Sequence, residues 1–218
     1  MKQIVKNPEP IEFTEWKTSW TDVTPGWYEF IGSPIKQIAI AAFIEEQGGL
    51  CCYCESHVGM GHGHIEHLRA KSKPEYAHLV LAYDNLFYSC QNNQAKNDSE
   101  EDNPPQTCGH AKGDKPLLIT PLDNDCEQRF IYTITGAIVA RDENDNDAIQ
   151  TIKLLKLEHK EAIFRKDRAK TFQSVEDARQ VLTSAEFDLW IDTVLKRQSN
   201  GMFKPFWTTI KYAAGLYE

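Results

Sequence analysis

Two neighbouring stretches in the middle of the chain decide the fold: Cys51-Cys52-Tyr53-Cys54 and His62-Gly63-His64-Ile65-Glu66-His67. The first contains a Cys-x-x-Cys turn formed by Cys51 and Cys54. Two thiolates at this spacing can occupy adjacent corners of a tetrahedral zinc site, which then needs two more ligands. The turn therefore predicts a structural four-cysteine zinc site whose second pair of ligands comes from elsewhere in the chain.

Cys90 and Cys108 are the natural candidates for that second pair. They flank residues 91–107, a polar stretch with prolines that is typical of a surface loop. Because an insertion of this kind can leave its two ends close together at a small entropic cost, the wide spacing is compatible with one site. The alternative is that some cysteines are only small buried apolar residues, which suits Cys52 and Cys126.

The second stretch places ionisable side chains on a predicted strand. On a strand, His64 and Glu66 project from one face, and His67 points to the other face unless the strand ends or bulges there. A carboxylate beside a neutral imidazole suits metal-assisted phosphodiester cleavage, since the carboxylate holds a divalent ion and the imidazole takes a proton from the attacking water. Alone, the pattern is a weak indication, because surface strands often carry such residues.

The segment before the cysteine turn carries a predicted helix. Residues 35–47 follow Pro34 and precede Gly48-Gly49, which is the usual order of a helix start and a helix stop. Apolar residues stand at Ile35, Ile38 and Ala42. The spacing predicts a helix of about three turns with these residues on its apolar face.

The segment after the central third is predicted to begin with a hairpin and to continue as helices. Residues 130–134 and 137–140, joined at Thr135-Gly136, have the composition of two paired strands. Helical spacing dominates from the acidic turn at 142–147 to about residue 198, and it returns over residues 203–216.

Two features of this C-terminal part allow two interpretations each. A net-basic helical stretch is usually a solvated helix face and alternatively contacts nucleic acid; its cations are Lys153, Lys156, Lys160, Arg165, Lys166, Arg168 and Lys170. An aromatic stripe belongs either to the core or to a partner-docking face; its members are Phe203, Phe206, Trp207 and Tyr212.

Composition narrows the function classes. The 218 residues carry a formal net charge of −8, which argues against a protein that coats nucleic acid without selectivity. An acidic chain can still cut nucleic acid where a metal ion supplies positive charge locally. No apolar run reaches the ~18 residues that span a bilayer, and the first residues lack the apolar region of a secretory signal. We therefore expect a cytoplasmic protein without membrane contact, whose six cysteines bind metal or are buried rather than form disulfides.

Motifs further along the chain extend the pattern. Asp84-Asn85-Leu86 precedes Ser89-Cys90, and Cys108-Gly109-His110-Ala111-Lys112-Gly113-Asp114 follows the polar loop. Together with the cysteine turn and Glu66-His67, this order resembles the HNH endonucleases from Cys51 to about Lys115. The closer resemblance is to the small HNH subunit of Septu-type and retron-associated phage-defence systems. It is carried by Cys-Cys-Tyr-Cys-Glu, Ile-Glu-His-Leu-Arg-Ala-Lys-Ser, Asp-Asn-Leu-x-x-Ser-Cys and Cys-x-His-x-Lys-Gly-Asp.

The resemblance implies an α+β fold with three parts. Residues 51–120 would form a ββα-metal (HNH) core that holds the four-cysteine zinc site and is surrounded by helices. Residues 1–50 would be a helical, Trp-rich segment that packs on the core. Residues 121–218 would contain the hairpin and a helical region that docks a partner, with residues 199–218 dispensable for a folded zinc core.

The resemblance also implies roles for single residues. His67 matches the general base, and Glu66 matches the acidic residue that binds the catalytic Mg²⁺ or Mn²⁺. Asn85 matches the central Asn of the signature, which braces a loop and orients the His. The structural zinc ligands match the four cysteines Cys51, Cys54, Cys90 and Cys108.

One position departs from the family pattern. Many HNH proteins place a metal-binding Asn or His directly after the last Cys, where this chain has Gly109. Either His110 or His64 then completes the catalytic site, and the sequence leaves the choice open.

The function that the resemblance implies is a metal-dependent HNH endonuclease that cleaves phosphodiester bonds in DNA or RNA, a tRNA among them. Such a protein is the effector of an anti-phage defence system and works with an ABC-type ATPase. In retron systems a reverse transcriptase and its DNA–RNA product join it. The alternative is a catalytically weak, zinc-stabilised adaptor that docks on the ATPase, an interpretation that the departure at Gly109 keeps open.

Overall fold

Helices surround two small two-stranded sheets in the structure, a computed structural model that describes residues 1–21, 23–91, 106–159 and 163–217. The α+β class expected from the sequence is confirmed. The predicted surface loop 91–107 lies almost entirely outside the described residues. Within the described ranges, no helix is both long and apolar enough to cross a bilayer.

The N-terminal part contains α1 (Ile11–Thr18), α2 (Trp27–Ile31) and α3 (Ile35–Gln47). The last of these confirms the helix predicted over residues 35–47. It stops at Gly48, whose φ of 63° lies in the left-handed region that glycine adopts without a Cβ clash.

The predicted apolar face of α3 is confirmed at Ile35 and Ala42, which are half-buried and pack against the core, but not at Ile38. Ile38, expected on that face, is 36 % exposed, whereas the buried apolar side chains belong to Ala39, Ile40, Phe43 and Ile44. The reason is that α3 is apolar almost all round, so several stripes have helical spacing. Packing against α1 and the central sheet selects one of them.

The central part is a hairpin followed by a short helix. Strand β1 (Gly63–His67) pairs antiparallel with β2 (Leu86–Cys90), with His67 opposite Leu86. Two 3-10 turns lie in the connection, η1 (Pro74–Leu79) and η2 (Tyr83–Asn85). All of β2 is buried, because α3 and α4 (Cys108–Lys112) both pack against it.

A second hairpin confirms the other strand prediction. Strands β3 (Phe130–Tyr132) and β4 (Ile138–Ala140) pair antiparallel, and both are shorter than expected. Gly136 lies in the turn between them with φ of 75°. Helix α5 (Asn146–Leu155) packs against β4 and α4.

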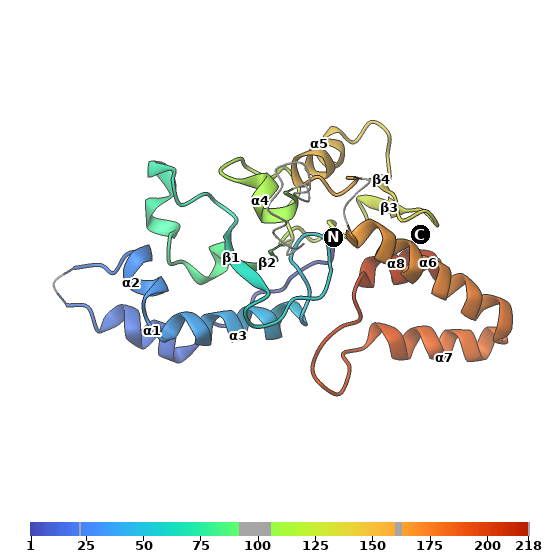
Figure 1. Cartoon of the computed structure of the whole chain (residues 1–218), viewed down its shortest axis with the longest axis horizontal. Coiled ribbons are helices and arrows are strands. Elements are labelled where there is room, and N and C mark those ends of the chain that lie inside the picture. Colours follow the sequence, from blue (N-terminus) through green and yellow to red (C-terminus); the bar gives the residue numbers. More distant parts are fainter. Residues whose placement is uncertain (22, 92–105, 160–162, 218) are drawn as a thin grey trace, which may run out of the picture.

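The C-terminal part consists of α6 (Ile163–Val181), α7 (Ser184–Leu195) and α8 (Trp207–Ala213), which confirms the predicted helical region. In Figure 1 these helices and the N-terminal helices α1 to α3 lie on opposite sides of β1, β2 and α4. Helix α8 packs against α6, α7 and β3.

Helix α8 is joined to the cysteine turn. The carboxylate of Glu55, the residue after Cys54, accepts hydrogen bonds from the backbone N–H and the hydroxyl of Thr208. The backbone N–H of Phe206 donates to the Glu55 carbonyl at 3.0 Å. The start of α8 is therefore fixed on the turn that carries two of the candidate metal ligands.

The same region contains the aromatic stripe, whose members differ in burial. Phe206 is buried, and the other members are half-buried. The Trp207 indole N–H donates to Leu195 O, and the Phe203 ring lies against Gly48, where an added Cβ would be 2.2 Å from it. Phe206 therefore belongs to the core, whereas a docking role for the half-buried Phe203 and Trp207 stays a prediction.

Candidate functional site

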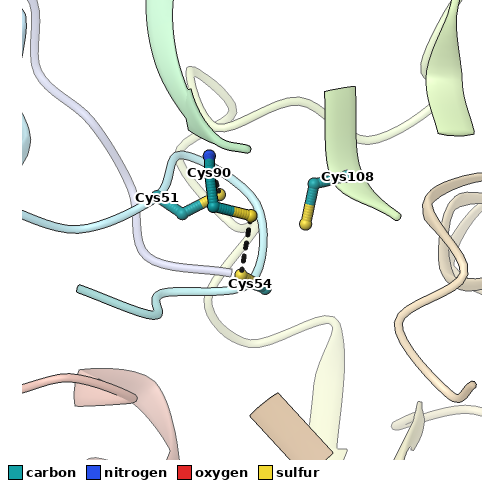
Figure 2. A group of neighbouring side chains, drawn as sticks. All are labelled: Cys51, Cys54, Cys90 and Cys108. Atoms are coloured by element: carbon teal, nitrogen blue, oxygen red, sulfur yellow. Dashed lines mark hydrogen bonds between the residues drawn. The ribbon is translucent and has the colours of Figure 1, made fainter. Parts of the chain in front are cut away.

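Four cysteine side chains converge between the turn after α3, the end of β2 and the start of α4, as Figure 2 shows. Their sulfur atoms all lie within 4.8 Å of one another, and all four residues are buried. They are the predicted set Cys51, Cys54, Cys90 and Cys108. Cys52 and Cys126 are buried and do not belong to this group, in agreement with their interpretation as plain core residues.

The geometry of this group fits a tetrahedral metal ion. Four sulfurs at about 2.3 Å from one zinc ion lie about 3.8 Å apart. The Cys54 and Cys90 sulfurs are 3.8 Å apart. Burial by itself raises the pKa of the Cys51 thiol, but hydrogen bonds from the neighbouring thiols, with Cys108 foremost, outweigh it and hold that pKa well below its ordinary value. The four thiols could therefore hold a structural metal ion.

A second group of ionisable side chains lies on the face where β1 meets α4. Nε2 of His64 is 3.5 Å from Oε2 of Glu66, and the rings of His64 and His110 are 4.3 Å apart between centroids. His64 Nδ1 is buried and has no hydrogen-bond partner within the described part of the chain. These three residues share a cavity of about 240 Å³; its lining also includes Ile65, His67, Ala70, Lys71, Gly109, Gly113 and Asp114.

The Glu66 carboxylate is held by partners on its other oxygen. Oε1 lies 2.9 Å from Lys112 Nζ and accepts a hydrogen bond from the Tyr53 hydroxyl at 3.1 Å. Burial by itself raises the pKa of Glu66, but hydrogen bonding from His64 and the charge of Lys112 outweigh it and lower the pKa. The carboxylate therefore stays ionised, and its Oε2 faces His64.

Lys112 is a residue to which the sequence reasoning gave no role. It is 1 % exposed, and its ammonium donates to His67 O at 2.8 Å and to Gly113 O at 3.2 Å in addition to the pair with Glu66. It thus ties α4 to the end of β1. The available signal was a lysine at a fixed place in the Cys-x-His-x-Lys-Gly motif, on the helix that begins at Cys108.

His67 has a ring whose tautomer follows from its contacts. Nε2 lies 3.0 Å from Val80 O, and the ring stands edge-on to Trp27 with centroids 4.6 Å apart. Because a carbonyl oxygen only accepts, Nε2 carries the proton and Nδ1 keeps a lone pair. Burial lowers the pKa of His67 to about 4, so the ring is neutral at pH 7.

Gly109 lies where a side chain has no room. A Cβ added at this position would be 2.5 Å from Glu66 Oε2 and 2.6 Å from His64 Nε2. The His64 and Glu66 side chains therefore occupy the space that a side chain at position 109 would need. The departure from the family pattern thus coincides with a histidine that reaches the same place from β1.

Asn85 clamps the loop that follows β1. Its Oδ1 accepts from the Arg69 backbone N–H at 2.7 Å, and its Nδ2 donates to Arg69 O at 3.1 Å and to Leu79 O at 3.0 Å. These contacts are those of a bracing residue. An effect of Asn85 on the orientation of His67 stays a prediction.

No family model matches the chain. Two known proteins are similar to it in sequence. The chain is 30 % identical over 121 residues to "Retron Vc95 putative HNH endonuclease" of Vibrio cholerae serotype O1 biovar El Tor, a match that covers 54 % of this chain and 55 % of that protein. It is 28 % identical over 146 residues to "Septu protein PtuB" of Bacillus mycoides strain KBAB4, covering 59 % and 48 %. The chain thus spans about half the length of each curated relative. The motif resemblance is confirmed, and the chain is a relative of the PtuB-like HNH proteins of Septu and retron systems.

Proposed function

We propose that the protein is a metal-dependent HNH endonuclease that hydrolyses phosphodiester bonds in DNA or RNA, with β1, β2 and α4 as its ββα-metal core. One observation carries the proposal: His64, Glu66 and His110 meet at a single cavity that His67 also lines. Two relatives from defence systems, one of them named as an HNH endonuclease, support it.

Two of the three side chains, His64 and Glu66, lie at a spacing that suits a divalent ion, and the His110 ring lies beside His64. Two ligands that lie about 2.1 Å from a shared ion are roughly 3.0–3.4 Å apart, depending on the coordination geometry. The 3.5 Å between His64 Nε2 and Glu66 Oε2 is close to that range, and the rings of His64 and His110 are 4.3 Å apart between centroids. We therefore assign both histidines to the ion, with His64 in the place that Gly109 leaves open.

The donor chemistry selects among metals. Mg²⁺ strongly prefers oxygen ligands, whereas imidazole nitrogen suits transition-metal ions. Since the set contains two imidazoles and one carboxylate, Mn²⁺ fits this chain better than Mg²⁺. When bound, the ion would stabilise the negative charge that develops on the phosphate and on the leaving 3′ oxygen.

The chain's own residues supply the proton transfer and its support. His67 accepts the proton of the attacking water at Nδ1, because Nε2 is occupied by Val80 O. General-base help of this kind contributes a factor of ~10²–10⁴ in rate. Lys112 keeps Glu66 ionised and in place, and Asn85 holds the loop behind His67.

The four cysteines hold a zinc ion with a structural role. A closed four-coordinate site has no open position for chemistry, and such a site contributes on the order of 10 kcal/mol to folding. Cys108 and His110 lie on the same short helix, α4. Zinc binding thereby also fixes the position of a catalytic ligand.

The setting is an anti-phage defence system in the cytoplasm, by analogy with the retron and Septu relatives. The partner would be an ABC-type ATPase that restrains the nuclease and delivers the substrate. In a retron, a reverse transcriptase and its DNA–RNA product would join the complex.

A second candidate function is the zinc-stabilised adaptor without catalysis. The ion pair of Glu66 with Lys112 favours it, because a carboxylate that a lysine already neutralises has less need of a metal ion. In this case the chain would dock on the ATPase and contribute no cleavage.

A cleavage assay separates the two. The purified chain, with and without the ATPase, is incubated with supercoiled plasmid, single-stranded DNA and tRNA, and either Mn²⁺ or Mg²⁺ is added. The nuclease predicts cleavage that needs less Mn²⁺ than Mg²⁺ and is lost in Glu66→Gln but kept in Glu75→Gln, a change of an exposed carboxyl on η1. The adaptor predicts no cleavage under any of these conditions.

A further inference from the structure

The loop that follows β1 carries a concentration of positive charge that is unusual in this acidic chain. Residues 69–73 read Arg-Ala-Lys-Ser-Lys, and no acidic residue stands between Glu66 and Glu75. The three cationic side chains are all exposed. In the described residues none of them forms an ion pair with a carboxylate of this chain.

The loop borders the proposed active site. Lys71 lines the cavity together with Glu66, His67 and His110. Its ammonium lies 5.1 Å from the centre of the Trp27 ring, and the same ring stands edge-on to His67. Trp27 on α2 therefore holds a cation and the proposed base side by side at the mouth of the cavity.

The loop is also preformed. Asn85 binds both the N–H and the carbonyl of Arg69, and a turn is closed by the hydrogen bond from Lys73 N to Ala70 O at 3.1 Å. The Arg69 guanidinium lies 5.8 Å from the Tyr76 ring centre. A loop that is already ordered loses little conformational entropy when it binds a ligand.

The other basic stretch, at residues 153–170, does not border the proposed active site, since none of its described residues lines that cavity. Arg168 is buried and donates to Gly136 O and Leu157 O, while Arg165 pairs with Glu158. Lys170 is exposed but lies 3.2 Å from Asp167. Arg165, Arg168 and Lys170 are thus engaged within the chain, whereas Lys153, Lys156 and Lys166 are exposed, in agreement with a solvated helix face.

We infer that residues 69–73 form a phosphate-binding loop that grips the sugar–phosphate backbone beside the scissile bond, with Lys71 as the cation nearest the reacting phosphate. The inference rests on the proposed nuclease function and adds to it the side from which the substrate enters, between the loop and α2. DNA and RNA share the phosphodiester that this loop recognises. The experiment therefore includes both.

Binding is measured by fluorescence anisotropy with no divalent ion added, so that no cleavage occurs. The probes are a labelled single-stranded DNA, the RNA of the same sequence and the DNA duplex. One lost phosphate contact weakens binding by about tenfold near 50 mM salt and lowers the slope of log K against log salt by about 1. Lys71→Ala should show both effects, while the matched variant Lys170→Ala should bind like the parent chain.

The results distinguish this inference from the proposed function. If binding depends on Lys71 but no metal ion supports cleavage, the loop is a nucleic-acid contact and the proposed nuclease function is contradicted. Cleavage with unchanged affinity and salt slope in Lys71→Ala would overturn the loop and leave the nuclease standing. Equal losses in both lysine variants, or no binding of any probe by the parent chain, would also overturn the inference. Circular dichroism and zinc content verify that each variant is folded.

Discussion

Lys112 and Glu66 form a buried ion pair, with Nζ 2.9 Å from Oε1 and both side chains less than 10 % exposed. The pair joins α4 to β1, and the same ammonium binds the backbone carbonyl of His67. Helix α4, which begins at the proposed zinc ligand Cys108, is thereby connected to Glu66 and His67, two of the residues with proposed catalytic roles.

Replacing Lys112 with Met should destabilise the fold, because it leaves a buried carboxylate without its cation. Breaking a buried pair in this way costs about 3–5 kcal/mol. The loss should appear in urea unfolding, and Lys115→Met, which changes an exposed lysine next to α4, should leave the unfolding midpoint unchanged. Adding Glu66→Gln to Lys112→Met should recover part of the loss. An unchanged midpoint in Lys112→Met would show that the pair is not formed.

Gly109→Ala should impair catalysis because it displaces side chains in the cavity, and it should leave the chain folded. The new methyl group would press on Glu66 Oε2 and His64 Nε2. A displacement near 1 Å of catalytic groups can cost about 10²-fold in rate. The control is Gly59→Ala, where the nearest atom would be 4.0 Å away. If Gly109→Ala cleaves at the parental rate and needs no additional Mn²⁺, the close approach of these groups is wrong.

Cys54→Ser should abolish zinc binding and the folded state. Each of the four cysteines offers one sulfur ligand, so the variant keeps only three. The ion that would join the cysteine turn, β2 and α4 is then lost. Elemental analysis should find close to one zinc per parental chain, and Cys126→Ser should keep it. A Cys54→Ser chain that is folded and free of metal would refute the structural role.

The cysteine group shows what could be predicted from the sequence. A Cys-x-x-Cys turn has the spacing of two zinc ligands. Cys90 and Cys108, at the ends of a polar insertion, supply the other two members of the four-cysteine group. The helix at 35–47 and the hairpin at 130–140 were also predictable from local signals. Pro34 and Gly48-Gly49 mark the two ends of the helix, and Thr135-Gly136 marks the turn of the hairpin.

The remaining features depend on contacts between distant segments. On α3, Ile38 was expected on the buried face and is exposed, because an apolar helix acquires its exact orientation from its neighbours. The Cys-x-His-x-Lys-Gly motif marked the position of Lys112 but did not predict its burial, and its role required the approach of Glu66 and His67 O from β1. Likewise, the sequence left His64 and His110 as alternatives, whereas the structure brings both to the same cavity.

Deleting residues 199–218 should unfold the chain rather than release a folded zinc core. The sequence alone favours a folded core after this deletion, but Phe206 directly before α8 and Ile210 within it are buried, and the start of α8 is bound by Glu55 beside Cys54. The milder variant Thr208→Val removes the buried hydrogen bonds of this hydroxyl to that carboxylate and to the Tyr132 hydroxyl, and should cost about 1–3 kcal/mol for each group left without a partner. Thr193→Val, on an exposed helix position, is the control. A truncated chain that keeps zinc and a cooperative unfolding transition would contradict the contact.

The cavity shared by His64, Glu66, His110 and His67 is the basis of the proposed nuclease, and a manganese titration of cleavage tests it most directly. The parent chain, His64→Ala and His67→Ala are compared on one nucleic-acid substrate, with zinc content and unfolding midpoint as checks of folding. We predict that His64→Ala regains activity as Mn²⁺ rises, because a lost ligand weakens ion binding, whereas His67→Ala stays inactive at every concentration, because a lost base is not replaced by metal. Full activity of His67→Ala, or an identical metal dependence of the parent and His64→Ala, would contradict the assignment.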